Sequence, residues 1–312
     1  MQPRRSGSSE VTAASVVVPT FNRRSELRGL LYSAQKQTAS LEIIVVDDGS
    51  TDGTAEMMRG EFPETSYERF AGPNGPSFLR NRGAQRAGAP ILFFLDDDSV
   101  LTSPSTIEQT VAEFEHPHVG AVGIPFVNAR HDQTVWQRAP EANAIYATHA
   151  FVGAASAVRR DVFVKLGGFR EHFFYMGEEG DFCIRMLNQG YVVRLGCADP
   201  IHHLESGRRH LSRAGFSGRR NDILFAWHNL PLRYLPIHIL GTTVKGMRTA
   251  LTHGCFCPML RGTFSGYIGC WKYRREREPV SASIYKLHRR LKKKGPARLE
   301  ELEQLLVPLR TK

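Results

Sequence analysis

Three consecutive carboxylates, at Asp96, Asp97 and Asp98, stand out in this chain because their spacing suits metal chemistry. They follow a short apolar run, Ile91–Leu95, that is typical of a buried strand. On an extended chain Asp96 and Asp98 point to one side and Asp97 to the other. Mg²⁺ and Mn²⁺ prefer oxygen ligands and often share them between protein carboxylates and substrate phosphates. We therefore expect Asp96 and Asp98 to hold a divalent cation. The alternative is an acidic loop that caps a following helix.

Two other loops carry groups that suit a nucleoside diphosphate. Asp48 can accept hydrogen bonds from a base or a ribose hydroxyl, and Thr20 and Asn22 offer hydrogen bonds at a strand end. Arg80 can donate charge-assisted hydrogen bonds to a diphosphate. The alternatives are a plain turn with a helix cap at residues 47–50 and a surface position for Arg80. The candidate donor-binding residues are Pro19, Thr20, Asn22, Asp48, Arg80 and Asp97.

A second acidic segment, residues 178–181, stands at the start of an expected helix. Carboxylates there complement the helix dipole, and this is the simpler reason for their presence. Glu179 or Asp181 is also a candidate general base for an acceptor hydroxyl. The two residues are two positions apart, so only one of them is expected to face the acceptor. Either His202 or His203 could supply an imidazole to the cation, although most histidines have structural roles.

The elements that must position these groups are visible as apolar patterns. Residues 16–18, 41–46 and 91–95 are short apolar runs, and apolar side chains at residues 27–34 recur at helical spacing. Further helices are expected from residue 54, at residues 161–166 and at residues 181–189, the last ending at Gly190. Strands that alternate with helices predict a mostly parallel sheet covered on both faces.

The three predicted strands end in polar loops at residues 19–22, 47–50 and 96–98. In open α/β sheets, ligands bind beyond the carboxyl ends of the strands. We therefore expect these loops to converge on one site.

Several segments resemble the motifs of family 2 glycosyltransferases. Residues 17–23 (VVPTFNR), 44–54 (IVVDDGSTDGT) and 95–98 (LDDD) resemble the family's nucleotide-binding signature. Residues 153–156 (GAAS), 173–182 (FFYMGEEGDF) and 201–206 (IHHLES) resemble its acceptor-side elements, in the same order. The resemblance covers about residues 14 to 225. It implies the GT-A fold, a Rossmann-like α/β fold with a mostly parallel central sheet.

The resemblance also implies a function. It describes an inverting, metal-dependent glycosyltransferase that moves a sugar, commonly from a UDP-linked donor, to a hydroxyl of a glycan or lipid-linked acceptor in polysaccharide or cell-surface glycan synthesis. By analogy Asp48 contacts the nucleobase, Asp96 and Asp98 form the Asp-x-Asp pair that binds Mg²⁺ or Mn²⁺, and His203 is favoured over His202. The base aligns with Glu179, where the family often has Asp, so the choice between Glu179 and Asp181 stays open.

Charge is distributed unevenly. Residues 207–312 contain 22 Lys/Arg and 6 Asp/Glu, a net charge of +16, whereas the whole chain is +10, so residues 1–206 carry −6. We expect a disordered tail at residues 1–13, a glycosyltransferase domain at residues 14–225 whose nucleotide-binding half ends near residue 115, and a basic, partly amphipathic helical region at residues 226–312. That region suits an anionic membrane surface, with a solvated extension or an oligomer contact as the alternative.

Other functions and locations are disfavoured. No recognisable nucleic-acid reader motif accompanies the basic residues. The five cysteines do not form a disulfide framework, and no signal peptide or spanning segment is recognisable, so we expect a cytoplasmic protein, peripheral on the inner face of the cell membrane if its basic region binds lipid. A sugar-phosphate nucleotidyltransferase would need a Gly-rich loop after the first strand, where residues 19–23 contain no glycine. A non-catalytic sugar-nucleotide-binding or scaffold protein is the remaining alternative.

Overall fold

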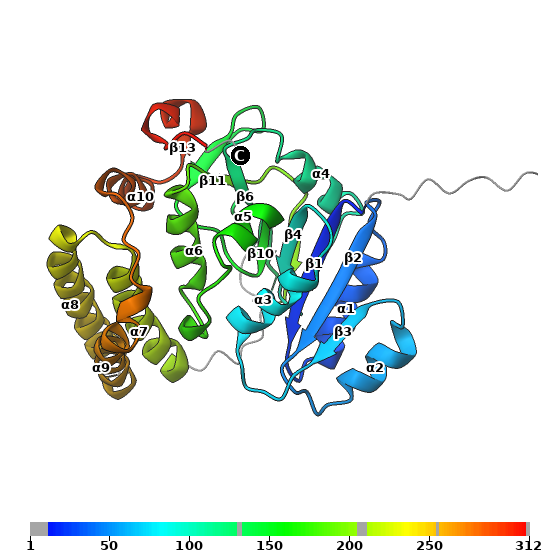
Figure 1. The fold of residues 1–312 in the computed structure, drawn as a ribbon. Helices are drawn as coiled ribbons and strands as arrows, with labels where there is room; N and C mark the ends of the chain where they lie inside the picture. Colours follow the sequence, from blue (N-terminus) through cyan, green and yellow to red (C-terminus); the bar gives the residue numbers. More distant parts are fainter. Residues whose placement is uncertain (1–11, 130–132, 205–210, 254–255, 310–312) are drawn as a thin grey trace, which may run out of the picture.

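The computed structural model describes residues 12–129, 133–204, 211–253 and 256–309 (Figure 1). Residues 1–11 of the predicted N-terminal tail, and residues 205–206 of the last motif, lie outside the described residues. Within the described ranges, a nine-stranded sheet has the order β13-β9-β11-β6-β10-β4-β1-β2-β3. A four-stranded sheet with the order β5-β12-β7-β8 is separate from it.

The first part of the chain alternates strands with helices. The parallel neighbours in the sheet are β1 (Ala14–Thr20), β2 (Leu41–Asp47), β3 (Ser66–Arg69) and β4 (Ile91–Leu95), and the connecting helices are α1 (Arg24–Ala34), α2 (Thr54–Glu61) and α3 (Pro76–Arg86). Alternate residues of β1 face opposite sides of the sheet. Val16 and Val18 share a core with α1, whereas Val17 packs against Gly83 of α3. The mostly parallel sheet with helices on both faces, predicted from the apolar runs, is confirmed.

The second part of the large sheet is mixed. β10 (Ala155–Arg159) lies antiparallel between β4 and β6 (Val119–Gly123), and β11 (Val192–Leu195) and β9 (Tyr146–Thr148) continue the sheet. The helices of this part are α4 (Thr106–Ala112), α5 (Arg160–Lys165) and α6 (Glu178–Leu187). Helix α6 begins three residues before its predicted start. Gly177, at a φ of 89°, precedes it, and Gly190, also at 89°, lies just beyond its end.

The small sheet brings a distant segment to the end of β4. It consists of β5 (Ser99–Val100), β7 (Phe126–Asn128), β8 (Val135–Trp136) and β12 (Ile201–His203). β12 is antiparallel to β5, with His203 opposite Ser99. Because β5 directly follows the acidic loop, this pairing places His203 beside that loop.

The C-terminal region is helical, as predicted. α7 (Leu211–Asn229), α8 (Leu235–His253) and α9 (Phe256–Lys272) lie together at one end of the molecule, and α10 (Ala282–Lys294) leads to β13 (Ala297–Arg298) (Figure 1). α7 runs through the predicted boundary at residue 225, and β13 pairs with β9 at the edge of the large sheet. The 3-10 turns are Glu171–Phe173, Leu232–Tyr234, Arg274–Glu276, Leu299–Glu301 and Glu303–Leu305. None of the described helices is both long and apolar enough to cross a membrane.

Candidate active site

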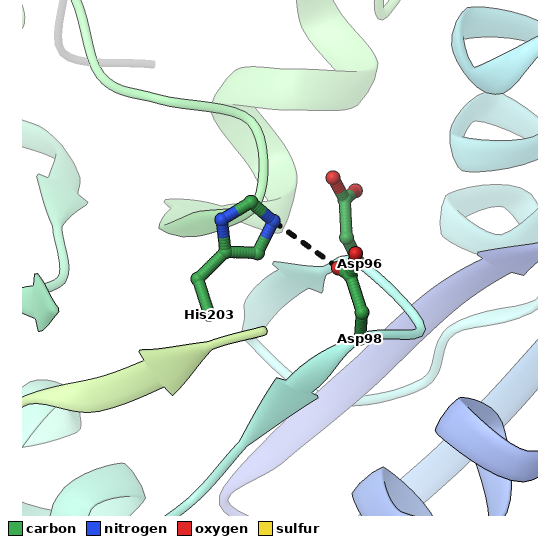
Figure 2. Close-up of side chains that lie close together, drawn as sticks. All are labelled: Asp96, Asp98 and His203. Carbon is green, nitrogen blue, oxygen red and sulfur yellow. Dashed lines mark ion pairs between the residues drawn. The ribbon is translucent and has the colours of Figure 1, made fainter. Parts of the chain in front are cut away.

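The acidic loop that follows β4 meets His203 at the carboxyl end of the parallel strands. Ligand atoms of Asp96, Asp98 and His203 all lie within 4.8 Å of one another. His203 Nε2 is 3.1 Å from Asp98 Oδ1, and Figure 2 shows both side chains beside Asp96. Asp98 and His203 are buried, whereas the Asp96 side chain is 34% exposed. The cluster is therefore buried at Asp98 and His203 and accessible to solvent at Asp96.

These three side chains fit a divalent cation. They offer carboxylate oxygens and an imidazole nitrogen, which Mn²⁺ and Mg²⁺ sites use. Asp98 Oδ1 is buried and faces the His203 imidazole at 3.1 Å, so the two most buried ligand groups are already held together. The open side at Asp96 leaves room for substrate oxygens.

The alternation of β12 distinguishes the two histidines. Ile201 and His203 are buried, whereas His202 between them is exposed. Successive residues of a strand point to opposite faces, so only one of the two imidazoles can turn toward the acidic loop. The preference for His203 agrees with this placement, and His202 lies outside the cluster.

Arg23, to which the sequence motifs assigned no role, pairs with two of the aspartates. Its Nη1 atom is 2.6 Å from Asp98 Oδ2 and 3.1 Å from Asp97 Oδ1. Burial would raise the pKa of Asp98, but His203 and Arg23 together hold this pKa below its usual value. The sequence offered one signal for Arg23, which directly follows Asn22, the last residue of a loop expected at the site.

Asp97 is not among the three residues whose ligand atoms form the cation cluster. It is 5% exposed and accepts a hydrogen bond of 2.8 Å from the Thr20 hydroxyl. Burial raises its pKa to about 7, against the opposing effect of Arg23. Thr20 and Asp97 thus connect the end of β1 to the acidic loop.

Arg80 is buried within the site rather than on the surface. It is 4% exposed, and it donates hydrogen bonds to Asp96 Oδ1 at 2.7 Å and to Glu178 Oε1 at 3.2 Å. Burial raises the pKa of Glu178 above its usual value, and the neighbouring Glu179 raises it further, despite Arg80. Arg80 therefore joins the acidic loop to the start of α6.

The two candidate bases have different environments. Asp181 is fully buried; it pairs with Arg170, with Arg185 at 2.9 Å, and accepts a hydrogen bond from Asn229 at 2.7 Å. These partners hold its pKa below the usual value although burial opposes them. Its lone pairs are therefore directed into the protein.

Glu179 is only partly buried and lies on the Arg80 side of α6. A Cβ atom added at Gly153 would lie 2.5 Å from Glu179 Oε1 and 3.0 Å from Arg80 Nη1. With a side chain at this position the ends of Glu179 and Arg80 would have to shift, so the absence of a Cβ at Gly153 permits this arrangement. Gly153 thus lets the backbone before β10 approach Glu179 closely.

The loops after β1 and β2 are tied together next to a shallow cavity. Asn22, at a φ of 52°, accepts a hydrogen bond from the Thr51 amide, and its own amide donates to Ser50. Asp48 accepts hydrogen bonds from the amides of Asn74 and Gly75. Pro19 is buried in β1 opposite Val46. The cavity has a volume of about 300 Å³ and is lined by Gly49, Arg69, Phe70, Ala71 and Gly72.

Comparison with known proteins places this site in a family context. The family model described as Glycosyl transferase family 2 matches residues 15–171, which is half of the chain. The O-antigen biosynthesis protein RfbC of Myxococcus xanthus is 28% identical over 223 residues, which cover 62% of this chain and 18% of RfbC. The GalNAc(5)-diNAcBac-PP-undecaprenol beta-1,3-glucosyltransferase of Campylobacter jejuni is 38% identical over 106 residues, which cover 32% of this chain and 34% of that enzyme. The match therefore spans about a third or less of either relative.

Solved structures share the fold over most of the chain. The mannosyltransferase PcManGT from Pyrobaculum calidifontis, in complex with GDP-Man and Mn²⁺, superposes with a TM-score of 0.58 at 18% identity, covering 92% of this chain and 89% of that one. Residues 1–349 of S. aureus TarS, in complex with UDP, give a TM-score of 0.60 at 15% identity, covering 94% and 90%. At these identities the likeness shows the fold, which is the predicted GT-A type.

Proposed function

The chain belongs to glycosyl transferase family 2, and on this basis we propose that it is an inverting, metal-dependent transferase that moves a sugar from a nucleoside diphosphate to an acceptor hydroxyl. The observation that carries the proposal is the cluster of Asp96, Asp98 and His203, which Arg80 connects to the start of α6. We assign donor binding to residues 14 to about 115 and acceptor binding to the residues that follow, up to about 225.

In the proposed reaction Glu179 is the general base. It is the carboxylate at the start of α6 that is partly exposed near Arg80, whereas Asp181 is occupied by two arginines. Glu179 would take the proton of the acceptor hydroxyl as that oxygen attacks the anomeric carbon and the bond to the diphosphate breaks. Arg80 would hold Asp96 and Glu178 in position. It would thereby fix the donor-binding half of the site relative to the acceptor-binding half.

Asp96, Asp98 and His203 would hold the cation. Mg²⁺ or Mn²⁺ bound there supplies charge neutralisation for the departing diphosphate. Arg23 would orient Asp98 from the opposite side to His203, because it bonds Oδ2 while the histidine faces Oδ1. A relative in complex with GDP-Man and Mn²⁺ supports a cation of this kind in the fold.

We place the nucleobase at the cavity beside Asp48. Thr20, Asn22 and Asp48 stand at the ends of β1 and β2, and Phe70 and Arg69 line the adjoining cavity. A uridine nucleotide is our first choice, and the complex of TarS with UDP supports it. A relative named for glucosyl transfer to a PP-undecaprenol-linked acceptor supports a lipid-linked glycan as acceptor and a role in cell-surface glycan synthesis.

The decisive experiment offers UDP-, GDP- and dTDP-sugars with Mn²⁺ or Mg²⁺ and measures nucleoside diphosphate release. We expect release with one of these donors, loss on chelation by EDTA, and a fall of roughly 100-fold in Asp98→Ala. Glu56→Gln, on the exposed side of α2, is the matched control and should retain wild-type release. Unchanged release by Asp98→Ala would rule out the cation assignment. Formation of pyrophosphate from a nucleoside triphosphate and a sugar phosphate would indicate a nucleotidyltransferase instead.

A further inference from the structure

Helices α8 and α9 expose large apolar side chains along one stripe each. On α9, Leu260, Phe264, Ile268 and Trp271 recur every three or four residues and are 53% to 70% exposed. On α8, the same spacing relates Ile237, Leu240, Val244 and Met247, which are 41% to 74% exposed. Side chains at this spacing lie on one side of a helix. Water is a poor environment for so many large apolar groups in a row.

The opposite side of α9 is already packed, so the exposed stripe is not part of the core. Gly262, Gly266 and Gly269 lie against α7, where added Cβ atoms would come within 2.3 to 2.9 Å of Phe216, Ile223 and Leu224. Likewise Gly246 of α8 lies against Arg219 of α7. Both helices therefore use their small residues to reach α7 and turn their largest apolar residues outward.

The two stripes adjoin one another. The hydroxyls of Thr243 and Tyr267 are 3.4 Å apart, so α8 and α9 touch at these positions. On α8, Leu240 and Met247 flank Thr243 at helical spacing, and on α9 Phe264 and Trp271 flank Tyr267. Figure 1 shows the two helices side by side at the end of the molecule away from β3. The α8–α9 apolar face consists of Ile237, Leu240, Val244, Met247, Leu260, Phe264, Tyr267, Ile268 and Trp271.

The surroundings of the α8–α9 apolar face are positively charged. Residues 223–275 contain seven Lys/Arg and no Asp or Glu. Lys245 and Arg248 border the stripe on α8, and Arg261 and Lys272 border that on α9, in each case on the side away from the neighbouring helix. Arg274 stacks over the Trp271 ring at 4.4 Å. An apolar strip edged on both sides by cations matches the acyl chains and headgroups of an anionic lipid layer.

We propose that α8 and α9 dock the protein on an anionic lipid bilayer, lying parallel to its surface with the α8–α9 apolar face in the headgroup region. Trp and Tyr side chains favour this depth, and Lys/Arg on the rim contact the lipid phosphates. A second copy of the chain fits the face less well, because a symmetric contact would bring the two basic rims together. This inference does not depend on the proposed transferase activity.

The test is sedimentation of the full chain with vesicles. One set consists of phosphatidylcholine, and the other contains about one third phosphatidylglycerol. The protein should bind the anionic vesicles, and binding should weaken between about 0.1 M and about 0.5 M NaCl. The double variants Phe264→Ser with Trp271→Ser, and Arg261→Glu with Lys272→Glu, should each lower the partition coefficient about tenfold. The matched controls are Val164→Ser and Lys165→Glu on α5, both exposed, which should bind like the wild type.

Two further measurements distinguish lipid binding from self-association. Tryptophan emission should shift to shorter wavelength on anionic vesicles. The Trp271→Phe variant should lose this shift but should still sediment with the vesicles. Light scattering should report a monomer. Failure to bind anionic vesicles at low salt, or equal binding by all variants, would overturn the proposal. If the wild type is a dimer that does not bind vesicles, and the apolar double variant is a monomer, the α8–α9 apolar face would be assigned to self-association. Nucleoside diphosphate release should be unchanged in these variants. A failure of the membrane proposal can therefore be distinguished from a failure of the proposed transferase activity.

Discussion

Arg80 and Gly153 illustrate how single positions determine the geometry of this site. The buried guanidinium of Arg80 bonds Asp96 and Glu178, which come from distant segments of the chain. Gly153 has no side chain, and this lets Glu179 and Arg80 approach the backbone. Neither residue needs to touch a substrate to affect turnover, since a shift of about 1 Å in a catalytic group has a large effect on rate.

Gly153→Ala should therefore lower kcat by roughly tenfold to 100-fold while the donor KM changes little. The added Cβ would meet Glu179 Oε1 at 2.5 Å and displace that carboxylate. Steady-state kinetics of nucleoside diphosphate release measure both constants. Gly29→Ala on α1, where a Cβ meets no atom within 4 Å, is the control. A wild-type kcat in Gly153→Ala would mean that turnover does not depend on the position of Glu179 that Gly153 permits.

The two candidate bases should also differ in their effect on stability. Asp181→Asn leaves Arg170 and Arg185 partly uncompensated in the interior and should lower the free energy of unfolding by about 3 kcal/mol. Glu179→Gln should change it by less than about 1 kcal/mol, because that side chain is only partly buried, yet it should abolish turnover. Urea denaturation and the release assay measure the two effects. Turnover lost only in Asp181→Asn, at wild-type stability, would reverse the assignment.

The individual elements differ in how far local sequence determines them. β1, β2 and β4 were predicted because their apolar runs are continuous. The antiparallel β10 was not, because Ala155–Arg159 contains a serine and small residues and becomes buried only through its neighbours β4 and β6. α7 and α9 approach closely because three glycines of α9 face α7. Glycines weaken an isolated helix, so local sequence alone does not determine this packing.

Gly262→Ala should therefore destabilise the protein although alanine favours helices. Its Cβ would lie 2.3 Å from the carbonyl oxygen of Phe216, a backbone atom of α7 that cannot move cheaply. The expected loss is about 1–3 kcal/mol in the free energy of unfolding. Gly241→Ala, in open space on α8, should instead stabilise by up to about 1 kcal/mol. Equal effects of the two changes in urea denaturation would contradict the α7–α9 packing.

For the molecule as a whole, the sequence predicted the α/β architecture and the convergence of three loops. It also grouped Asp96, Asp98 and His203, because each stands in a recognisable motif. It could not choose between Glu179 and Asp181, since the choice also depends on Arg170 and Asn229, which come from other segments and join Arg185 of α6 around Asp181. The contribution of β13 to the large sheet was also not predictable, because two residues carry no periodic pattern.

The junction between the C-terminal helices and the rest of the chain should make stability depend on pH. His288 of α10 is buried beside His149, Lys292 and His238. Its pKa is lowered to about 3, mainly by burial and further by the charges of these three neighbours. The charge of Asp222 acts on His238, where it opposes the lowering of the pKa of that histidine. An unfolded histidine has a pKa of about 6.5, so between these values the unfolded state binds more protons. Stability should then fall as the pH falls, by roughly 2 kcal/mol between pH 7 and pH 5 from this residue.

Urea denaturation at pH 7, 6 and 5 measures this slope. His288→Gln cannot titrate, so its free energy of unfolding should fall less steeply over the same range, whatever its stability at pH 7. An identical slope in the variant would show that other groups determine the acid sensitivity. His172 and His228, whose pKa values burial lowers to about 3 and about 4, should account for part of the remaining slope.

The pairing of β13 with β9 also has a consequence for synthesis of the chain. The outer edge of β9 is completed by residues 297–298, which are translated about 150 residues later than residues 146–147. At typical rates of about 5–20 residues per second, this edge stays unpaired for roughly 8–30 s during translation. An uncovered strand edge is a site for pairing with other chains. Nascent chains should therefore be most prone to aggregation in this interval, and ribosome-bound fragments ending before residue 297 should bind chaperones more than longer ones.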